Sequence, residues 1–110
     1  MSVTDEQAEA AVDYLRDTAK DYGKACGRLA YLEGNLRRVK ALMMVESQRA
    51  GGTIADREAA AYASEAYREA LEQLENATAD KETIRAYRDA AEAKFEMWRS
   101  VNSNKRAGIV

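Results

Sequence analysis

A single Gly-Gly pair, Gly51-Gly52, interrupts a chain of 110 residues that contains no proline. The remainder is rich in alanine, glutamate, arginine, lysine and leucine, the residues with the highest helix propensities. Because glycine adopts positive φ without steric cost, a Gly-Gly pair ends a helix. The sequence therefore predicts an all-α chain with one sharp turn near its middle.

Capping signals place the ends of the predicted helices. Thr4 with Gln7, and Thr53 with Asp56, fit or come close to the spacing of a capping box. We therefore expect a first helix over about residues 5–49, a turn at 50–53 and a second helix over about 54–101. The polar stretch 76–80 is a candidate for an interruption of the second helix, and residues 102–110 are expected to form a flexible tail.

Apolar residues recur at three- and four-residue steps in both halves, which is typical of coiled-coil packing. In the first half the stripe runs from Val12 to Leu29 and continues, after a phase slip, from Leu32 to Met43. Two halves of similar length joined by a short turn favour a long antiparallel helical hairpin, folded as a single helical domain.

Each helix of such a hairpin has only one neighbour, so part of each apolar stripe stays exposed unless another copy covers it. We therefore expect a homo-oligomer. Small residues on one face of the first helix are candidates for its interface, although they fit a locally weak helix equally well. These residues are Gly23, Gly27, Ala30 and Gly34.

The chain has no histidine, which removes the commonest general base and most zinc sites. Carboxylates at helical spacing, such as Glu65 and Glu69, are better explained as a solvated face than as a catalytic or metal site. The single cysteine, Cys26, is expected to be a small core residue. We expect a protein that is not an enzyme and that uses no cofactor, metal or small-molecule substrate.

Membrane and export signals are missing from the sequence. No apolar run approaches the roughly 18 residues that a membrane helix needs. The first residues lack the basic and apolar regions of a secretory signal. We expect a cytoplasmic protein with no membrane partner.

The net charge of −2 conceals a strong segregation along the chain. Residues 16–49 carry eight bases and four acids, whereas residues 50–93 carry ten acids and five bases. In the basic zone cations recur every four residues and line one helix face, which is typical of a surface that binds a nucleic-acid backbone. Aspartates at 13, 17 and 21 offer the alternative of ordinary intrahelical pairing. The candidate nucleic-acid contacts are Arg16, Lys20, Lys24, Arg28, Arg37, Arg38, Arg99, Lys105 and Arg106.

The aromatic residue nearest the C-terminus, Trp98, has two interpretations. It is either a core anchor or a platform on which a base stacks. Core anchoring is the commoner role of a tryptophan on an apolar helix stripe.

A set of residues in both halves resembles the sequence pattern of small helical proteins from bacteriophage recombination loci. In the first half these are Leu32-Glu33, Leu36, Lys40 and Met43-Met44. In the second half they are Tyr62-Ala63, Tyr67-Arg68, Ala70-Leu71, Glu82, Arg85, Ala90-Ala91, Lys94, Met97-Trp98-Arg99-Ser100 and Arg106. The layout resembles UvsY-type recombination mediators over roughly residues 10–106. The resemblance implies a ring-forming protein of the host cytoplasm that binds single-stranded DNA, helps to load a recombinase and displaces single-strand-binding protein.

Two other functions remain open on the sequence. The acidic second half would suit a protein-only module, such as a phage-encoded inhibitor or adaptor of a host complex that faces a basic partner. A structural coiled coil of a virion is the third alternative.

Overall fold

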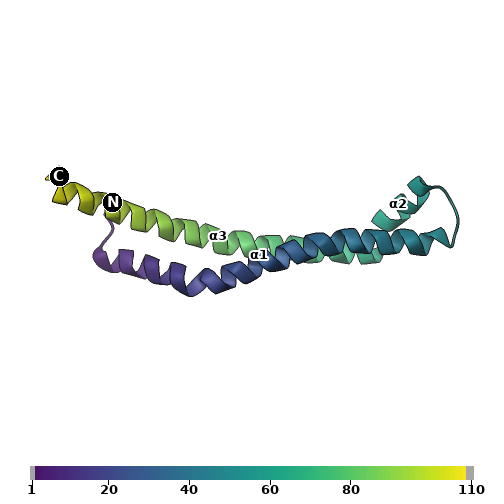
Figure 1. Ribbon diagram of the computed structural model, residues 1–110, viewed down its shortest axis with the longest axis horizontal. Helices are drawn as coiled ribbons and strands as arrows, with labels where there is room; N and C mark the ends of the chain where they lie inside the picture. Colours follow the sequence, from purple (N-terminus) through teal and green to yellow (C-terminus); the bar gives the residue numbers. More distant parts are fainter. Residues whose placement is uncertain (1, 109–110) are drawn as a thin grey trace. The chain divides into compact units, whose positions relative to one another are not determined.

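The computed structural model describes residues 2–108, and within this range it is helical with no strand. Its helices are α1 (Asp5–Gln48), α2 (Ile54–Tyr62) and α3 (Glu65–Arg106), as Figure 1 shows. The predicted all-α class is confirmed. Contacts divide the described chain into a terminal unit, residues 2–23 with 82–108, and a central unit, residues 24–81. The expectation of a single domain stays a prediction.

Both predicted capping boxes form. The backbone N–H of Thr4 donates to the Gln7 side chain over 3.0 Å, and the N–H of Gln7 donates to the Thr4 hydroxyl over 3.1 Å. The same reciprocal pair joins Thr53 and Asp56 at the start of α2, over 3.0 and 3.1 Å. Each box satisfies two backbone N–H groups that the first helical turn leaves without a partner.

The predicted turn lies where the glycines are. α1 ends at Gln48, and Gly51 and Gly52 have φ angles of 82° and 99°. Residues with a Cβ rarely adopt these angles, so the Gly-Gly pair is the physical cause of the turn.

The second predicted helix is divided at Ser64, and the candidate interruption at 76–80 is wrong. The Ser64 hydroxyl donates to the Ala61 carbonyl over 2.7 Å and accepts from the Tyr67 N–H over 3.2 Å. A serine that bonds to nearby backbone groups competes with the helix and caps the next one. Residues 76–80 lie inside α3, where Ala77 is 3% exposed and packs in the core.

The C-terminal end of the second helix is also further along the chain than expected. α3 continues to Arg106, so residues 102–106 are helical and the prediction of a flexible tail over them is wrong. The Asn102 amide donates to the Trp98 carbonyl over 3.0 Å, and the basic residues of the last turn complement the helix dipole. Residues 109–110 lie outside the described range.

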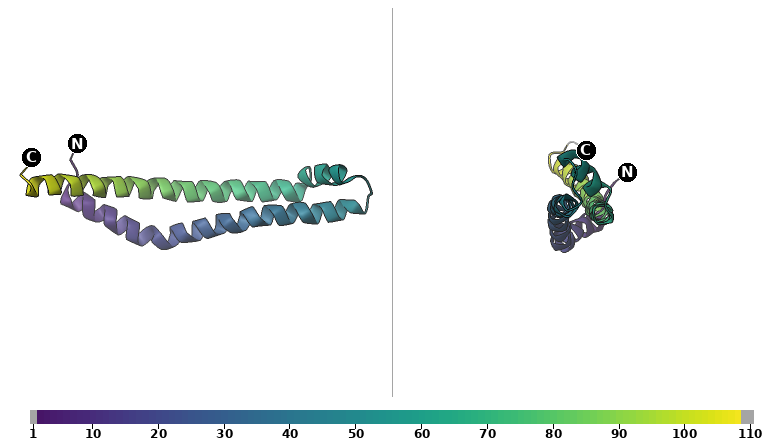
Figure 2. Two further views of the ribbon diagram at one scale, coloured as in Figure 1. Left: turned by 45° about the horizontal axis from the view of Figure 1, so that its top comes forward. Right: turned by 90° about the vertical axis from the view of Figure 1, so that its right-hand side faces the viewer.

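In each unit α1 and α3 run antiparallel, as the left view of Figure 2 shows. In the terminal unit the Trp98 indole donates to the Asp5 carboxylate over 2.7 Å, and Arg88 donates to the Leu15 carbonyl over 2.7 Å. The start of α1 therefore lies beside the end of α3.

Within each unit a set of buried or half-buried positions of α1 follows the alternating three- and four-residue steps of a heptad. In the central unit this set passes residues 29 and 32 without the phase slip that the apolar stripe predicted. These seam positions are 8, 11, 15, 18 and 22 in the terminal unit and 25, 29, 32, 36, 39 and 43 in the central unit. Val12 and Ala19, which the apolar stripe included, are exposed. Small residues such as Ala11 and Thr18 occupy the seam instead, so a search for large apolar residues misses it.

The core of the central unit is small. Leu29, Leu32 and Ala77 form its buried cluster, and Leu74 packs against it. α2 is attached to α1 by a salt bridge of 2.9 Å between Lys40 and Glu58. A core of this size leaves large apolar side chains exposed, among them Tyr31, Val45 and Ile54.

Candidate nucleic-acid interface

The outer side of α1 in the central unit carries an exposed tyrosine among cations. Tyr31 is 70% exposed, whereas Leu29 and Leu32, its neighbours in the sequence, are buried. Helical spacing places Lys24 two turns before Tyr31 and Arg38 two turns after it on the same face. We define the Tyr31 face as Lys24, Gly27, Arg28, Tyr31, Gly34 and Arg38, all of them exposed.

Two glycines of this face flank the tyrosine along the helix. Gly27 precedes Tyr31 by four residues and Gly34 follows it by three, so each is its neighbour on the helix surface. A Cβ built on either glycine meets nothing within 4 Å, and the same holds for Gly23 in the terminal unit. Within the described residues no packing contact accounts for glycine at these positions. Each costs the helix about 1 kcal/mol relative to alanine.

The cations of the Tyr31 face have no salt bridge among residues 2–108, and the same is true of Arg37. Arg37 lies about a third of a turn away from Tyr31 around the helix. Residues 24–48 carry five bases and two acids, which gives this stretch of α1 a net charge of +3. The charges of Lys24, Arg28, Arg37 and Arg38 are therefore available to an anion in solution.

The remaining predicted contacts belong to the terminal unit and differ in their surroundings. Arg16 pairs with Asp17 at 3.1 Å and with Asp13 at 3.4 Å, and the hydrogen bond with Asp17 is the main cause of its raised pKa. Arg99 pairs with Glu96 at 2.8 Å. Intrahelical pairing thus accounts for these two arginines. Lys20, Lys105 and Arg106 are exposed.

The contacts of Trp98 favour the core interpretation over base stacking. Its indole N–H is bound to Asp5, and its ring stacks on Phe95 with centroids 5.9 Å apart. The side chain is half-buried. Tyr31 takes its place as the candidate stacking residue. The sequence favoured Trp98 because Tyr31 lies outside the apolar stripe. The signal for Tyr31 was its spacing from Lys24 and Arg38.

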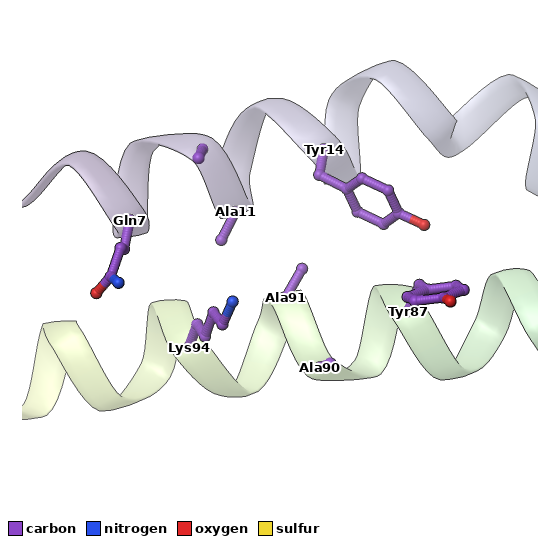
Figure 3. A pocket seen from close by; sticks show the side chains of 8 residues that line it. Gln7, Ala11, Tyr14, Tyr87, Ala90, Ala91 and Lys94 are labelled. Carbon is purple, nitrogen blue, oxygen red and sulfur yellow. The ribbon is translucent and has the colours of Figure 1, made fainter. Parts of the chain in front are cut away.

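A second feature is an open cleft of about 310 Å³ in the terminal unit, between α1 and α3. Figure 3 shows Tyr14 and Tyr87 at one end and Gln7 and Lys94 at the other. Four alanines complete the lining, Ala10, Ala11, Ala90 and Ala91. The cleft offers mainly apolar surface, and no carboxylate lines it. Among the described residues no group of histidine, cysteine, aspartate and glutamate side chains is arranged to hold a metal ion.

The terminal unit also holds a half-buried cation, Arg88, on the seam of α3. Its guanidinium donates to the Leu15 carbonyl and to the Thr18 hydroxyl, both over 2.7 Å, and lies 5.3 Å from the centroid of the Tyr22 ring. These contacts join the two helices, so Arg88 has a structural role.

Comparison with known proteins gives no relative: no family model, curated protein or solved structure matches this chain. In the part of the chain that the structure describes, no helix has the length and apolar content to cross a membrane.

Proposed function

We propose that this chain is a non-enzymatic helical protein that binds single-stranded nucleic acid through the Tyr31 face. The observation that carries the proposal is the 70% exposed ring of Tyr31 between Lys24, Arg28 and Arg38. An exposed aromatic ring can stack on any base, and cations bind phosphates without reading sequence.

The glycines support this role. Gly27 and Gly34 remove the side chains that would otherwise stand beside the ring, so a base can approach either side of Tyr31. Single strands fit such a face better than duplexes, because the bases of a duplex are already stacked on one another.

The resemblance to UvsY-type mediators supports DNA as the nucleic acid and a role in phage recombination or replication. It adds a recombinase and a single-strand-binding protein as further partners, in the host cytoplasm. These assignments, and the homo-oligomer, belong to the proposal.

The proposal is tested by fluorescence anisotropy with a labelled oligo-dT strand at low and moderate salt. Tyr31→Ala is compared with Tyr87→Ala, a matched control because Tyr87 is 64% exposed but lies in the terminal unit. Loss of one stacked base costs about 1–3 kcal/mol, so Tyr31→Ala should weaken binding by about 5- to 150-fold. Tyr87→Ala should leave the affinity unchanged.

Charge reversal provides an independent readout. Lys24→Glu with Arg28→Glu should weaken binding to all sequences alike and reduce the salt dependence, by a slope of about 0.7 for each phosphate that the variant no longer neutralises. Equal affinities of the two tyrosine variants, or no binding of the wild-type protein at low salt, would refute the proposal.

A protein partner is the second candidate, favoured by exposed apolar side chains on both sides of the turn. Val45 near the end of α1 is 63% exposed, and Ile54 at the start of α2 is 70% exposed. Exposed apolar groups of this kind mark surfaces that bind other proteins. If oligonucleotide binding fails, an adaptor or inhibitor that docks through this end becomes the leading function.

A further inference from the structure

The central unit carries opposite charges on two of its helices. Residues 24–48 of α1 have a net charge of +3, whereas residues 65–81 of α3 carry five acids and two bases, a net charge of −3. The acids Glu65, Glu69 and Glu72 are exposed, on the side of α3 away from the buried Ala70 and Ala77.

The two outer faces also have matching spacing. On α1, Lys24, Arg28, Tyr31, Asn35 and Arg38 follow steps of four, three, four and three residues. On α3, Glu65, Glu69, Glu72 and Asn76 follow steps of four, three and four. Two helices with the same step pattern can pack side by side over several turns. We name this row and the acids that flank it the acidic face of α3, which comprises Glu65, Glu69, Glu72, Glu75 and Asp80.

These charges are only partly paired within one copy. Among the described residues of the central unit no salt bridge joins α1 to α3, and the Lys40–Glu58 pair joins α1 to α2. Arg68 binds Glu65 and Glu72 within its own helix, which leaves Glu69 and Glu75 without a salt bridge among residues 2–108.

We infer that the acidic face of α3 in a second copy binds the Tyr31 face of the first. The opposite net charges of the two helix segments select a second copy as the occupant, because every copy carries both faces. The contact is heterologous, since a face on one copy meets a different face on the next. Gly27 and Gly34, predicted from the sequence as interface residues, would then admit the neighbouring helix closely.

Self-association and nucleic-acid binding then compete for one surface. This second part of the inference rests on the proposed function, whereas the contact between copies does not. Exposed ion pairs are individually weak and are screened by salt, so the contact between copies should be weak and salt-sensitive. A strand of higher charge density should displace the second copy.

Charge exchange tests the contact. The first variant, Lys24→Glu with Arg28→Glu, reverses the Tyr31 face, and the second, Glu69→Lys with Glu75→Lys, reverses the acidic face. A matched control, Asp89→Lys with Glu92→Lys, makes the same change of charge on exposed residues of α3 in the terminal unit. Sedimentation velocity is measured at low and moderate salt, and circular dichroism checks the helix content of every variant.

We expect the wild-type protein and the control to self-associate at low salt, with an association constant at least about tenfold lower at moderate salt. Each charge-reversed variant alone should sediment as a monomer, and an equimolar mixture of the two should form a complex again. The second variant should bind oligo-dT as the wild-type protein does, whereas the first should bind it more weakly.

A wild-type monomer at low salt, or self-association that survives Glu69→Lys with Glu75→Lys, would overturn the inference. Restored association in the mixture without any oligo-dT binding by the wild-type protein would support the contact between copies and refute the proposed function alone. Binding of oligo-dT that leaves the self-associated species intact would overturn the competition.

Discussion

Replacing Arg88 with methionine tests whether a half-buried cation stabilises the terminal unit. The Arg88 guanidinium makes two bonds of 2.7 Å, to the Leu15 carbonyl and the Thr18 hydroxyl, and lies 5.3 Å from the Tyr22 ring centroid. Hydrogen bonds to charged groups contribute about 1.5–3 kcal/mol each, and a cation–π contact adds about 0.5–1 kcal/mol. The low ends of these ranges apply because solvent reaches part of the site.

These contributions total about 3.5 kcal/mol at their low ends. Methionine keeps the apolar stem of arginine and removes the cost of desolvating a cation, which offsets about 1.5 kcal/mol. We therefore expect Arg88→Met to lower the free energy of unfolding by about 2 kcal/mol. Thr18→Val removes one of the two acceptors and should be coupled to Arg88→Met by about 1 kcal/mol in a double-mutant cycle.

Urea denaturation followed by circular dichroism measures these differences. Arg85→Met is the matched control, because Arg85 lies one turn earlier in α3 and makes only long, exposed pairs of 3.7 Å with Glu82 and 3.9 Å with Asp89. Such pairs contribute about 0–1 kcal/mol, so the control should change stability little. If Arg88→Met falls within about 0.5 kcal/mol of the wild-type protein, the reasoning about its two bonds is wrong.

Three further predictions concern the central unit. Leu32→Ala should lower the free energy of unfolding by about 2–4 kcal/mol in urea denaturation, because Leu32 is 3% exposed in a small core; a loss below about 1 kcal/mol would show that the core is not packed as described. The hydrogen bond from Lys40 is the main cause of the lowered pKa of Glu58. This carboxylate therefore stabilises the folded state at pH values above its unfolded pKa of about 4.3, and this stabilisation is lost as the pH falls through its folded pKa. Glu58→Gln should therefore be less stable than the wild-type protein at neutral pH and equal to it in acid, and a difference that persists in acid would contradict this cause. Gly27→Ala and Gly34→Ala should each raise the free energy of unfolding of the monomer by about 1 kcal/mol, and with it the melting temperature, because the added methyl group meets open space. A lower melting temperature would contradict that geometry.

Local chemistry made the helices and the main turn predictable. The capping boxes at Thr4 and Thr53 use only neighbouring residues, and the Gly-Gly turn needs only backbone freedom. The sequence alone therefore predicts these features. The break at Ser64 also depends only on neighbouring residues. The alanine-rich sequence before it favours an unbroken helix, so the serine cap was not predicted.

Packing between helices decided the rest, because it depends on which side chains meet across the seam. The seam admits Ala11 and Thr18 and leaves Val12 exposed, an arrangement that depends on how closely the two helices approach and not on hydrophobicity. The same packing buries one side of Trp98 against Phe95 and Asp5.

The candidate site was therefore predictable only in part. Residue spacing placed Lys24, Arg28 and Arg38 on one helix, and the tertiary structure decided that this side of α1 faces solvent with Tyr31 among them. Each neighbouring helix buries one side of a helix, so only the packed structure determines which side remains exposed.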